Sequence, residues 1–134
     1  MRLLLLSNST SPGKSYLEHS TEWFKDFLPP GAKIAFVPFA GVTISWDDYT
    51  EKFNQYLSSL GMTAIGVHQM SNPVREMADL DAIAVGGGNT FYLLKQLYDQ
   101  GFINPIRQML TEGMPYIGWS AGSNIAGPHI HTTN

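Results

Sequence analysis

The sequence predicts an α/β domain with a doubly wound, mostly parallel sheet and helices on both faces. Short apolar runs alternate with amphipathic segments along the 134 residues. Such alternation is typical of an open parallel sheet whose crossover helices cover both faces. Glycine and proline separate the segments, and we see no internal repeat or linker. A chain of this length is expected to form one domain.

Short apolar runs predict the strands. Leu3–Leu6 consists of four leucines and is expected to be buried on both faces of the sheet. The run at 33–39 reads KIAFVPF, and the run at 81–85 leads into three consecutive glycines. The other strands are expected at residues 62–67, 115–118 and 129–133.

Apolar residues at three- and four-residue steps predict the helices. Pro29 ends the first of them, and Gly61, Gly101 and Gly113 end three others. Asn89 is placed to cap the helix that follows it. The helices are expected at residues 15–28, 46–60, 72–77, 90–100 and 105–112, and in a short segment after Ser120.

The default strand order for this pattern is 3-2-1-4-5, with right-handed crossovers. Ligands bind such sheets beyond the carboxyl ends of the strands, where the strand order reverses. In the expected order, this point lies between the first and fourth strands. Three loops, at residues 7–14, 86–90 and 119–122, are therefore expected to form the site.

Composition excludes several classes of function. Eight Lys and Arg against 11 Asp and Glu give a net charge of −3, which argues against a nucleic-acid partner. The absence of Cys removes disulfides, thiolate metal sites and Cys nucleophiles, and suits a reducing compartment. The longest aliphatic run, Leu3–Leu6, is far shorter than the roughly 20 residues of a membrane span. We therefore expect a soluble, cytoplasmic protein without a membrane partner.

One motif carries chemistry. Residues 118–122 read Gly-Trp-Ser-Ala-Gly, a full G-x-S-x-G match between a predicted strand and a predicted helix. This pattern builds a nucleophile elbow, in which a sharp turn presents the serine hydroxyl at the end of the sheet. Ser120 is the predicted nucleophile. The alternative is a Gly-Ser turn that does no chemistry.

Attack by a serine generates an oxyanion, which acyl-transfer enzymes stabilise with preorganised N–H donors. The first candidate donor is the N–H of Ala121, the residue after the nucleophile. The second is the N–H of Gly88. The alternative is that the three glycines at residues 86–88 form only a tight turn. Asn89 either caps its helix or points its amide at a polar group of the substrate.

The chain offers no convincing general base for Ser120. His19 is expected inside a helix, away from the carboxyl edge of the sheet. His68 follows the third strand, about four strand spacings or roughly 19 Å from the serine. His129 and His131 share one face of the last strand, which leads away from the elbow, and no third ligand suggests a metal site there. In G-x-S-x-G hydrolases the acid and the histidine usually follow the serine. Only 14 residues follow it here, so we expect a domain that is incomplete at its C-terminus.

Four blocks, taken together, carry a family resemblance. On these blocks the chain resembles, over essentially all its length, the peptidase E family of α-aspartyl dipeptidases. The blocks are residues 3–10 (LLLLSNST), 37–43 (VPFAGVT), 86–90 (GGGNT) and 116–122 (YIGWSAG).

The resemblance implies a cytoplasmic serine peptidase that hydrolyses dipeptides with an N-terminal aspartate, without metal or nucleotide cofactor. It implies a fold similar to that of class I glutamine amidotransferases. Ser120 matches the family's nucleophile, Gly88 and Ala121 match its oxyanion positions, and Asn89 lies in the block that helps to hold the aspartyl end. The family's histidine, its acidic partner and a substrate-binding arginine fall beyond position 134. The isolated chain is therefore expected to be inactive, and a docked C-terminal remainder is a second possible partner.

Other interpretations stay open. Residues 8–15 resemble a phosphate-binding loop, with Asn8 in place of its first glycine and Pro12 removing one donor. A binding module that merely retains the elbow, or a cyanophycinase-like hydrolase of another aspartyl peptide, also fits the motif. Asp47 and Asp48 are expected to stabilise the start of a helix. Trp46 and Trp119 are expected to be packing residues.

Overall fold

In the part of the chain that the structure describes, a parallel sheet of five strands lies at the centre. The computed structural model describes residues 1–6 and 17–126, and within them every pair of neighbouring strands is parallel. The predicted α/β class is confirmed. The strands are β1 (Leu3–Leu6), β2 (Lys33–Val37), β3 (Thr63–Gly66), β4 (Ala82–Val85) and β5 (Tyr116–Trp119).

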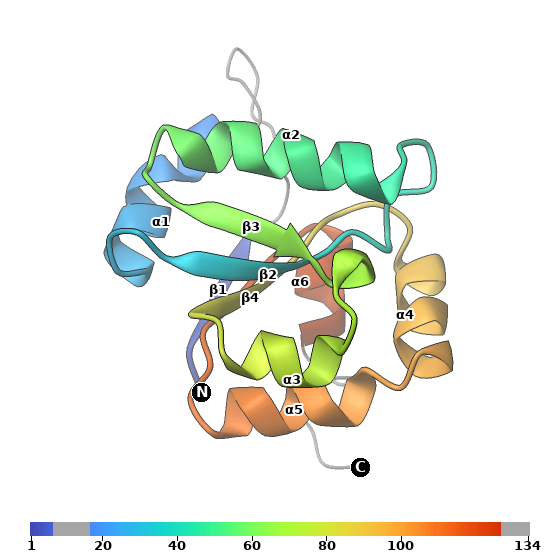
Figure 1. Ribbon diagram of the computed structural model, residues 1–134. Coiled ribbons are helices and arrows are strands. Elements are labelled where there is room, and N and C mark those ends of the chain that lie inside the picture. The colour runs from blue at the N-terminus through green and yellow to red at the C-terminus, as the bar shows by residue number, and fades with distance from the viewer. Residues whose placement is uncertain (7–16, 127–134) are drawn as a thin grey trace.

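Helices cover both faces of the sheet, as the sequence predicts. Figure 1 shows α2 above the sheet and α3 and α5 below it, and side chains of α1 pack in the same apolar cluster as those of α2. Side chains of α4 and α6 pack in the same apolar cluster as those of α3 and α5. The helices are α1 (Thr21–Phe27), α2 (Trp46–Ser58), α3 (Pro73–Ala78), α4 (Thr90–Asp99), α5 (Ile103–Thr111) and α6 (Ala121–Ile125), with 3-10 turns η1 (Glu18–Ser20) and η2 (Val67–Gln69).

Strand β2 shows how one sheet carries two cores. Successive side chains of a strand point to opposite faces. Ile34 and Phe36 accordingly pack against α1 and α2, while Ala35 and Val37 pack against the helices of the other face. All four side chains are fully buried, so a continuous apolar run is what this strand requires.

The strand order differs from the expected one. It is β1-β5-β4-β2-β3, so β1 lies at the edge of the described sheet, not between β2 and β4. Leu5 is 44% exposed, and the prediction that β1 is buried on both faces was wrong. The small side chains of β4 fill the central place instead, and all four of its residues are buried.

This strand order changes the place where the order reverses, which was expected between the first and fourth strands. The chain leaves β2 for β3 through α2 on one face, and leaves β4 for β5 through α4 and α5 on the other. The order therefore reverses between β2 and β4. The loop after β2 thus joins those after β4 and β5 at the site. The predicted loop at 7–14, with its resemblance to a phosphate-binding loop, lies outside the described residues, as does the predicted strand at 129–133.

Several element boundaries also differ from prediction. In place of one helix from residue 15, the described part has a buried Leu17 at φ 58°, then η1, then α1. Val67, predicted in a strand, begins η2. Pro105 is the third residue of α5, where the missing N–H has no helical partner to lose. No helix in the described residues is long and apolar enough to span a membrane.

Candidate active site

The turn from β5 into α6 holds Ser120 in a strained conformation. Its φ of 56° and ψ of −116° lie in a region of backbone angles that residues other than glycine rarely adopt. The residue directly follows β5, precedes the first residue of α6 and is partly exposed. This is the geometry that the G-x-S-x-G pattern predicts for an elbow.

The two glycines of the motif are required by close backbone contacts. A Cβ at Gly118 would lie 2.7 Å from the carbonyl carbon of Gly122. A Cβ at Gly122 would overlap the carbonyl oxygen of Val85, at the end of β4. The first turn of α6 therefore sits directly against the backbone of β4 and β5, which leaves Ser120 at the corner.

Hydrogen bonds join the elbow to the backbone of β1 and β5. The N–H of Ser120 donates to the carbonyl of Leu6 over 3.0 Å. The hydroxyl of Ser123 lies 2.6 Å from that carbonyl oxygen and 2.7 Å from that of Gly118. The Tyr116 hydroxyl donates to the carbonyl of Gly122 over 2.7 Å, and burial raises the pKa of this phenol beyond its usual range. The phenol therefore stays a hydrogen-bond donor at all ordinary pH values.

The glycine loop, residues 86–88, packs against the elbow. A Cβ at Gly87 would lie 2.8 Å from the Cβ of Ser120. Gly88 has φ +141°, and a Cβ there would overlap the carbonyl oxygen of Ala40. The ends of the loop are held by two bonds to the segment after β2: Gly86 N–H to Val37 (3.2 Å) and Asn89 N–H to Ala40 (2.8 Å).

The two predicted oxyanion donors directly follow the residues in this contact, because Gly88 follows Gly87 and Ala121 follows Ser120. Ala121 is the first residue of α6, so its N–H has no partner within the helix. Among the described residues, neither the N–H of Ala121 nor that of Gly88 donates to a backbone carbonyl of the turns and loops. The structure thus brings Ser120 close to the loop that carries Gly88, while the role of both N–H groups stays a prediction.

Asn89 does cap its helix. Its side-chain oxygen accepts from the N–H of Tyr92 over 2.9 Å, which confirms the capping interpretation. The residue also lines a pocket of about 260 Å³ beside the glycine loop. Contact with a substrate therefore stays a prediction. The pocket is lined by residues 40–44 of the loop after β2, by Tyr49 and Lys52 of α2, and by Gly87, Gly88 and Asn89.

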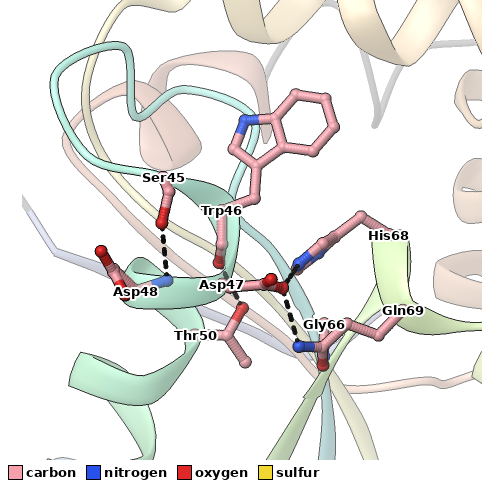
Figure 2. Close-up of polar contacts among 8 residues, drawn as sticks. All are labelled: Ser45, Trp46, Asp47, Asp48, Thr50, Gly66, His68 and Gln69. Carbon is pink, nitrogen blue, oxygen red and sulfur yellow. Dashed lines mark hydrogen bonds and ion pairs between the residues drawn. The ribbon is translucent and has the colours of Figure 1, made fainter.

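Of the two histidines in the described residues, His68 lies away from Ser120. His68 in η2 bonds through Nε2 to Asp47 of α2 over 2.7 Å (Figure 2). Three strand spacings, about 14 Å, separate β3 from β5. The expected four spacings were wrong because β1 does not intervene, but the distance remains too long for a hydrogen bond. His19 lies in η1. His129 and His131 lie outside the described residues.

The cluster around His68 has a structural role that the sequence partly predicts. Asp47 and Asp48 lie in the first turn of α2, as expected, with Ser45 as an unpredicted N-cap. Asp47 also accepts from the side chain of Gln69 over 3.0 Å, and the bond to His68 holds the pKa of Asp47 below its usual range. The cluster joins the start of α2 to the end of β3.

Sequence reasoning missed Tyr49. Its hydroxyl donates to the carbonyl of Gly87 over 3.0 Å and accepts from the indole N–H of Trp119 over 3.3 Å. In the sequence, Tyr49 is one apolar position in the helical spacing of residues 46–60, which indicates only a buried face. No signal in the sequence separates it from the other aromatic core residues. Trp119 is fully buried, as predicted for a packing residue.

Comparison with known proteins identifies a family that the chain matches. The model of peptidase family S51 matches residues 3–134. Proteins named peptidase E from Shigella flexneri serotype 5b and from Citrobacter koseri are each 49% identical over all 134 residues. The chain spans 58% of the length of each relative.

A solved structure supports the same match. The “Putative Peptidase E Protein” from Listeria monocytogenes EGD-e matches with a TM-score of 0.74 and 29% identity. The match covers 96% of this chain and 63% of that one. With the family model matching nearly every residue, this chain belongs to peptidase family S51.

Proposed function

We propose that this chain is the nucleophile-bearing part of a cytoplasmic serine peptidase that hydrolyses dipeptides with an N-terminal aspartate. Ser120 is the nucleophile, and the N–H groups of Gly88 and Ala121 stabilise the oxyanion. Asn89 contacts the aspartyl end of the substrate. The aspartyl specificity rests on the resemblance of the four sequence blocks to α-aspartyl dipeptidases.

The observation that carries this proposal is the strained backbone of Ser120. Positive φ at a residue other than glycine costs about 1–3 kcal/mol and persists where the surroundings enforce it. Here Gly118 and Gly122 are packed against backbone so that the turn can form. Such strain at a partly exposed serine, beside a glycine loop, is typical of a hydrolase elbow.

The chemistry follows from this arrangement. Ser120 Oγ bonds to the carbonyl carbon of the scissile peptide as a base accepts the hydroxyl proton. The carbonyl oxygen takes the electron pair and lies between the two donor N–H groups. The C–N bond then breaks, the amine leaves with the proton, and water hydrolyses the acyl-enzyme. No cofactor enters these steps.

The base is expected outside the described residues. Within residues 1–6 and 17–126, the histidines are His19 and His68, which lie in η1 and η2. The remaining length of the S51 relatives is where we place the base and its acidic partner. The 134-residue chain alone is therefore expected to be inactive.

The test assays the complete protein that carries this chain on Asp-Leu, with Glu-Leu and N-acetyl-Asp-Leu as controls. We expect the protein to hydrolyse Asp-Leu and neither of the two control peptides. We expect Ser120→Ala to lower kcat by about 10⁴-fold or more. His68→Ala is the matched control, and it should keep the activity because His68 faces Asp47. A fluorophosphonate probe, located by peptide mass spectrometry, should label Ser120.

Two results would contradict the proposal. Activity retained in Ser120→Ala would remove this residue as the nucleophile. Labelling of Ser120 without hydrolysis of Asp-Leu would leave a serine hydrolase of different specificity.

A further inference from the structure

The glycine loop and the elbow are linked through one side chain of α2. Tyr49, in the first turn of that helix, is 7% exposed. Its hydroxyl accepts from Trp119, the residue before Ser120, and donates to Gly87, the residue before Gly88. A chain of hydrogen bonds thus runs from the nucleophile strand through Tyr49 to the loop of the second oxyanion donor.

The ring of Tyr49 is fixed by its neighbours. It contacts Phe36 edge to face, with centroids 5.1 Å apart and an interplanar angle of 82°. Phe36 in turn stacks on Trp119 at 5.9 Å. A Cβ at Gly86 would lie 2.5 Å from the Tyr49 hydroxyl oxygen, and a Cβ at Gly41 would lie 2.8 Å from its ring. The hydroxyl therefore has little freedom to leave the loop.

The bond to Gly87 determines the direction of the Gly88 N–H. The carbonyl of Gly87 and the N–H of Gly88 belong to one peptide unit, which is planar and trans, so the two groups point in opposite directions. When Tyr49 holds the carbonyl towards α2, the N–H is directed away from α2. Because glycine lies on both sides of this peptide, its backbone conformation tolerates rotation of the unit unusually well.

The other bonds of the loop do not fix this peptide. Gly86 N–H and Asn89 N–H hold the two ends to Val37 and Ala40. The side chain of Asn89 bonds to its own helix. The middle peptide is therefore the part of the loop that depends on Tyr49.

We infer that Tyr49 is a positioning residue for catalysis, whose hydroxyl holds the Gly87–Gly88 peptide so that the Gly88 N–H faces the oxyanion. This inference rests on the proposed function of Ser120 and Gly88. It assigns Tyr49 no contact with the substrate. Its effect is on the transition state, because an oxyanion donor strengthens its bond only as the charge develops.

The test compares the complete wild-type protein with Tyr49→Phe and with Tyr56→Phe. Tyr56 lies in the same helix, and its hydroxyl bonds to Thr21 Oγ1 over 3.1 Å, on the side of α1. Both variants lose one tyrosine hydroxyl, so Tyr56→Phe controls for the loss of a partly buried hydrogen bond. We expect Tyr49→Phe to lower kcat for Asp-Leu about tenfold, with KM changed less than twofold. Tyr56→Phe should keep both constants.

A second readout does not depend on activity. Hydrogen exchange at the Asn89 N–H, which bonds to Ala40 directly after the Gly87–Gly88 peptide, and at the Trp119 indole N–H should accelerate in Tyr49→Phe and not in Tyr56→Phe. If the wild type fails to hydrolyse Asp-Leu but exchange accelerates as expected, the proposed substrate is wrong and the positioning of the loop stands. If kcat is unchanged in Tyr49→Phe, or exchange is unchanged where no activity exists, the inference is overturned.

Discussion

Two strand ends of the same sheet carry the kinds of group that serine hydrolysis uses, and they are built in opposite ways. The end of β5 holds Ser120 at positive φ against close backbone contacts. The end of β3 holds His68 against Asp47, with Gln69 as a second partner (Figure 2). At the end of β5, a strained backbone lies beside the glycine loop. At the end of β3, side-chain hydrogen bonds join α2 to the sheet.

The difference shows why residue types alone do not identify an active site. His68 and Asp47 have the chemistry of a base and its orienting acid. They lie three strands away from the serine, since β2 and β4 separate β3 from β5. Strain that the surroundings enforce is found at the β5 end, and the proposed function rests on that strain.

The largest expected effect contrasts a glycine at each strand end. A Cβ at Gly122 would overlap the carbonyl oxygen of Val85, and β4 cannot move because it pairs with strands on both sides. A Cβ at Gly66 would overlap the ring of His68 and lie 2.9 Å from Thr50 Oγ1, and both contacts are with side chains, which can shift more easily than paired backbone. We expect Gly122→Ala to lower the free energy of unfolding by about 3 kcal/mol and Gly66→Ala by about 1 kcal/mol. Urea unfolding of the two variants measures this contrast, and equal losses would contradict it.

The next effect tests the strain at Ser120 itself. Glycine adopts positive φ without steric cost, so Ser120→Gly should raise the free energy of unfolding by about 1 kcal/mol. Ser120→Ala keeps a Cβ and should leave stability close to that of the wild type. The same urea experiment compares the two variants. If Ser120→Gly instead lowered the free energy of unfolding, as substitution to glycine does at positions with negative φ, the backbone at Ser120 would not be strained.

Much of the fold is predictable because the residues that end helices, and the spacing of apolar residues within each element, can be read from short stretches of sequence. Pro29, Gly61 and Gly101 mark the ends of helices correctly, and the alternation of strands and helices identifies the class. Strand order is not local. Four leucines make β1 more apolar than the Ala-Ile-Ala-Val of β4, yet among the described strands β4 lies at the centre and β1 at the edge. Which strand lies inside depends on pairing between distant segments, and hydrophobicity does not report that pairing.

The site divides in the same way. The elbow is predictable because the constraints on Gly118, Ser120 and Gly122 fall within five residues of the sequence. The contribution of Tyr49 is not, because its partners Gly87 and Trp119 are 38 and 70 residues away. A tyrosine at helical spacing indicates a buried face, and only the folded chain shows where its hydroxyl lies.

The smallest effect belongs to the β3 end and depends on pH. Hydrogen bonds from His68 and Gln69 lower the pKa of Asp47 below its ordinary value of 3.8. A carboxyl with a depressed folded pKa adds stability that is present above the unfolded pKa and is lost as pH falls through the folded pKa. The melting temperature of the wild type should therefore fall more steeply than that of Asp47→Asn as pH drops below about 5. Asp48→Asn removes the same charge from the same helical turn without touching His68, and it should follow the wild-type profile. Parallel profiles for wild type and Asp47→Asn would show that the cluster does not stabilise the fold, which would leave the β3 end without the structural role that sets it apart from the elbow.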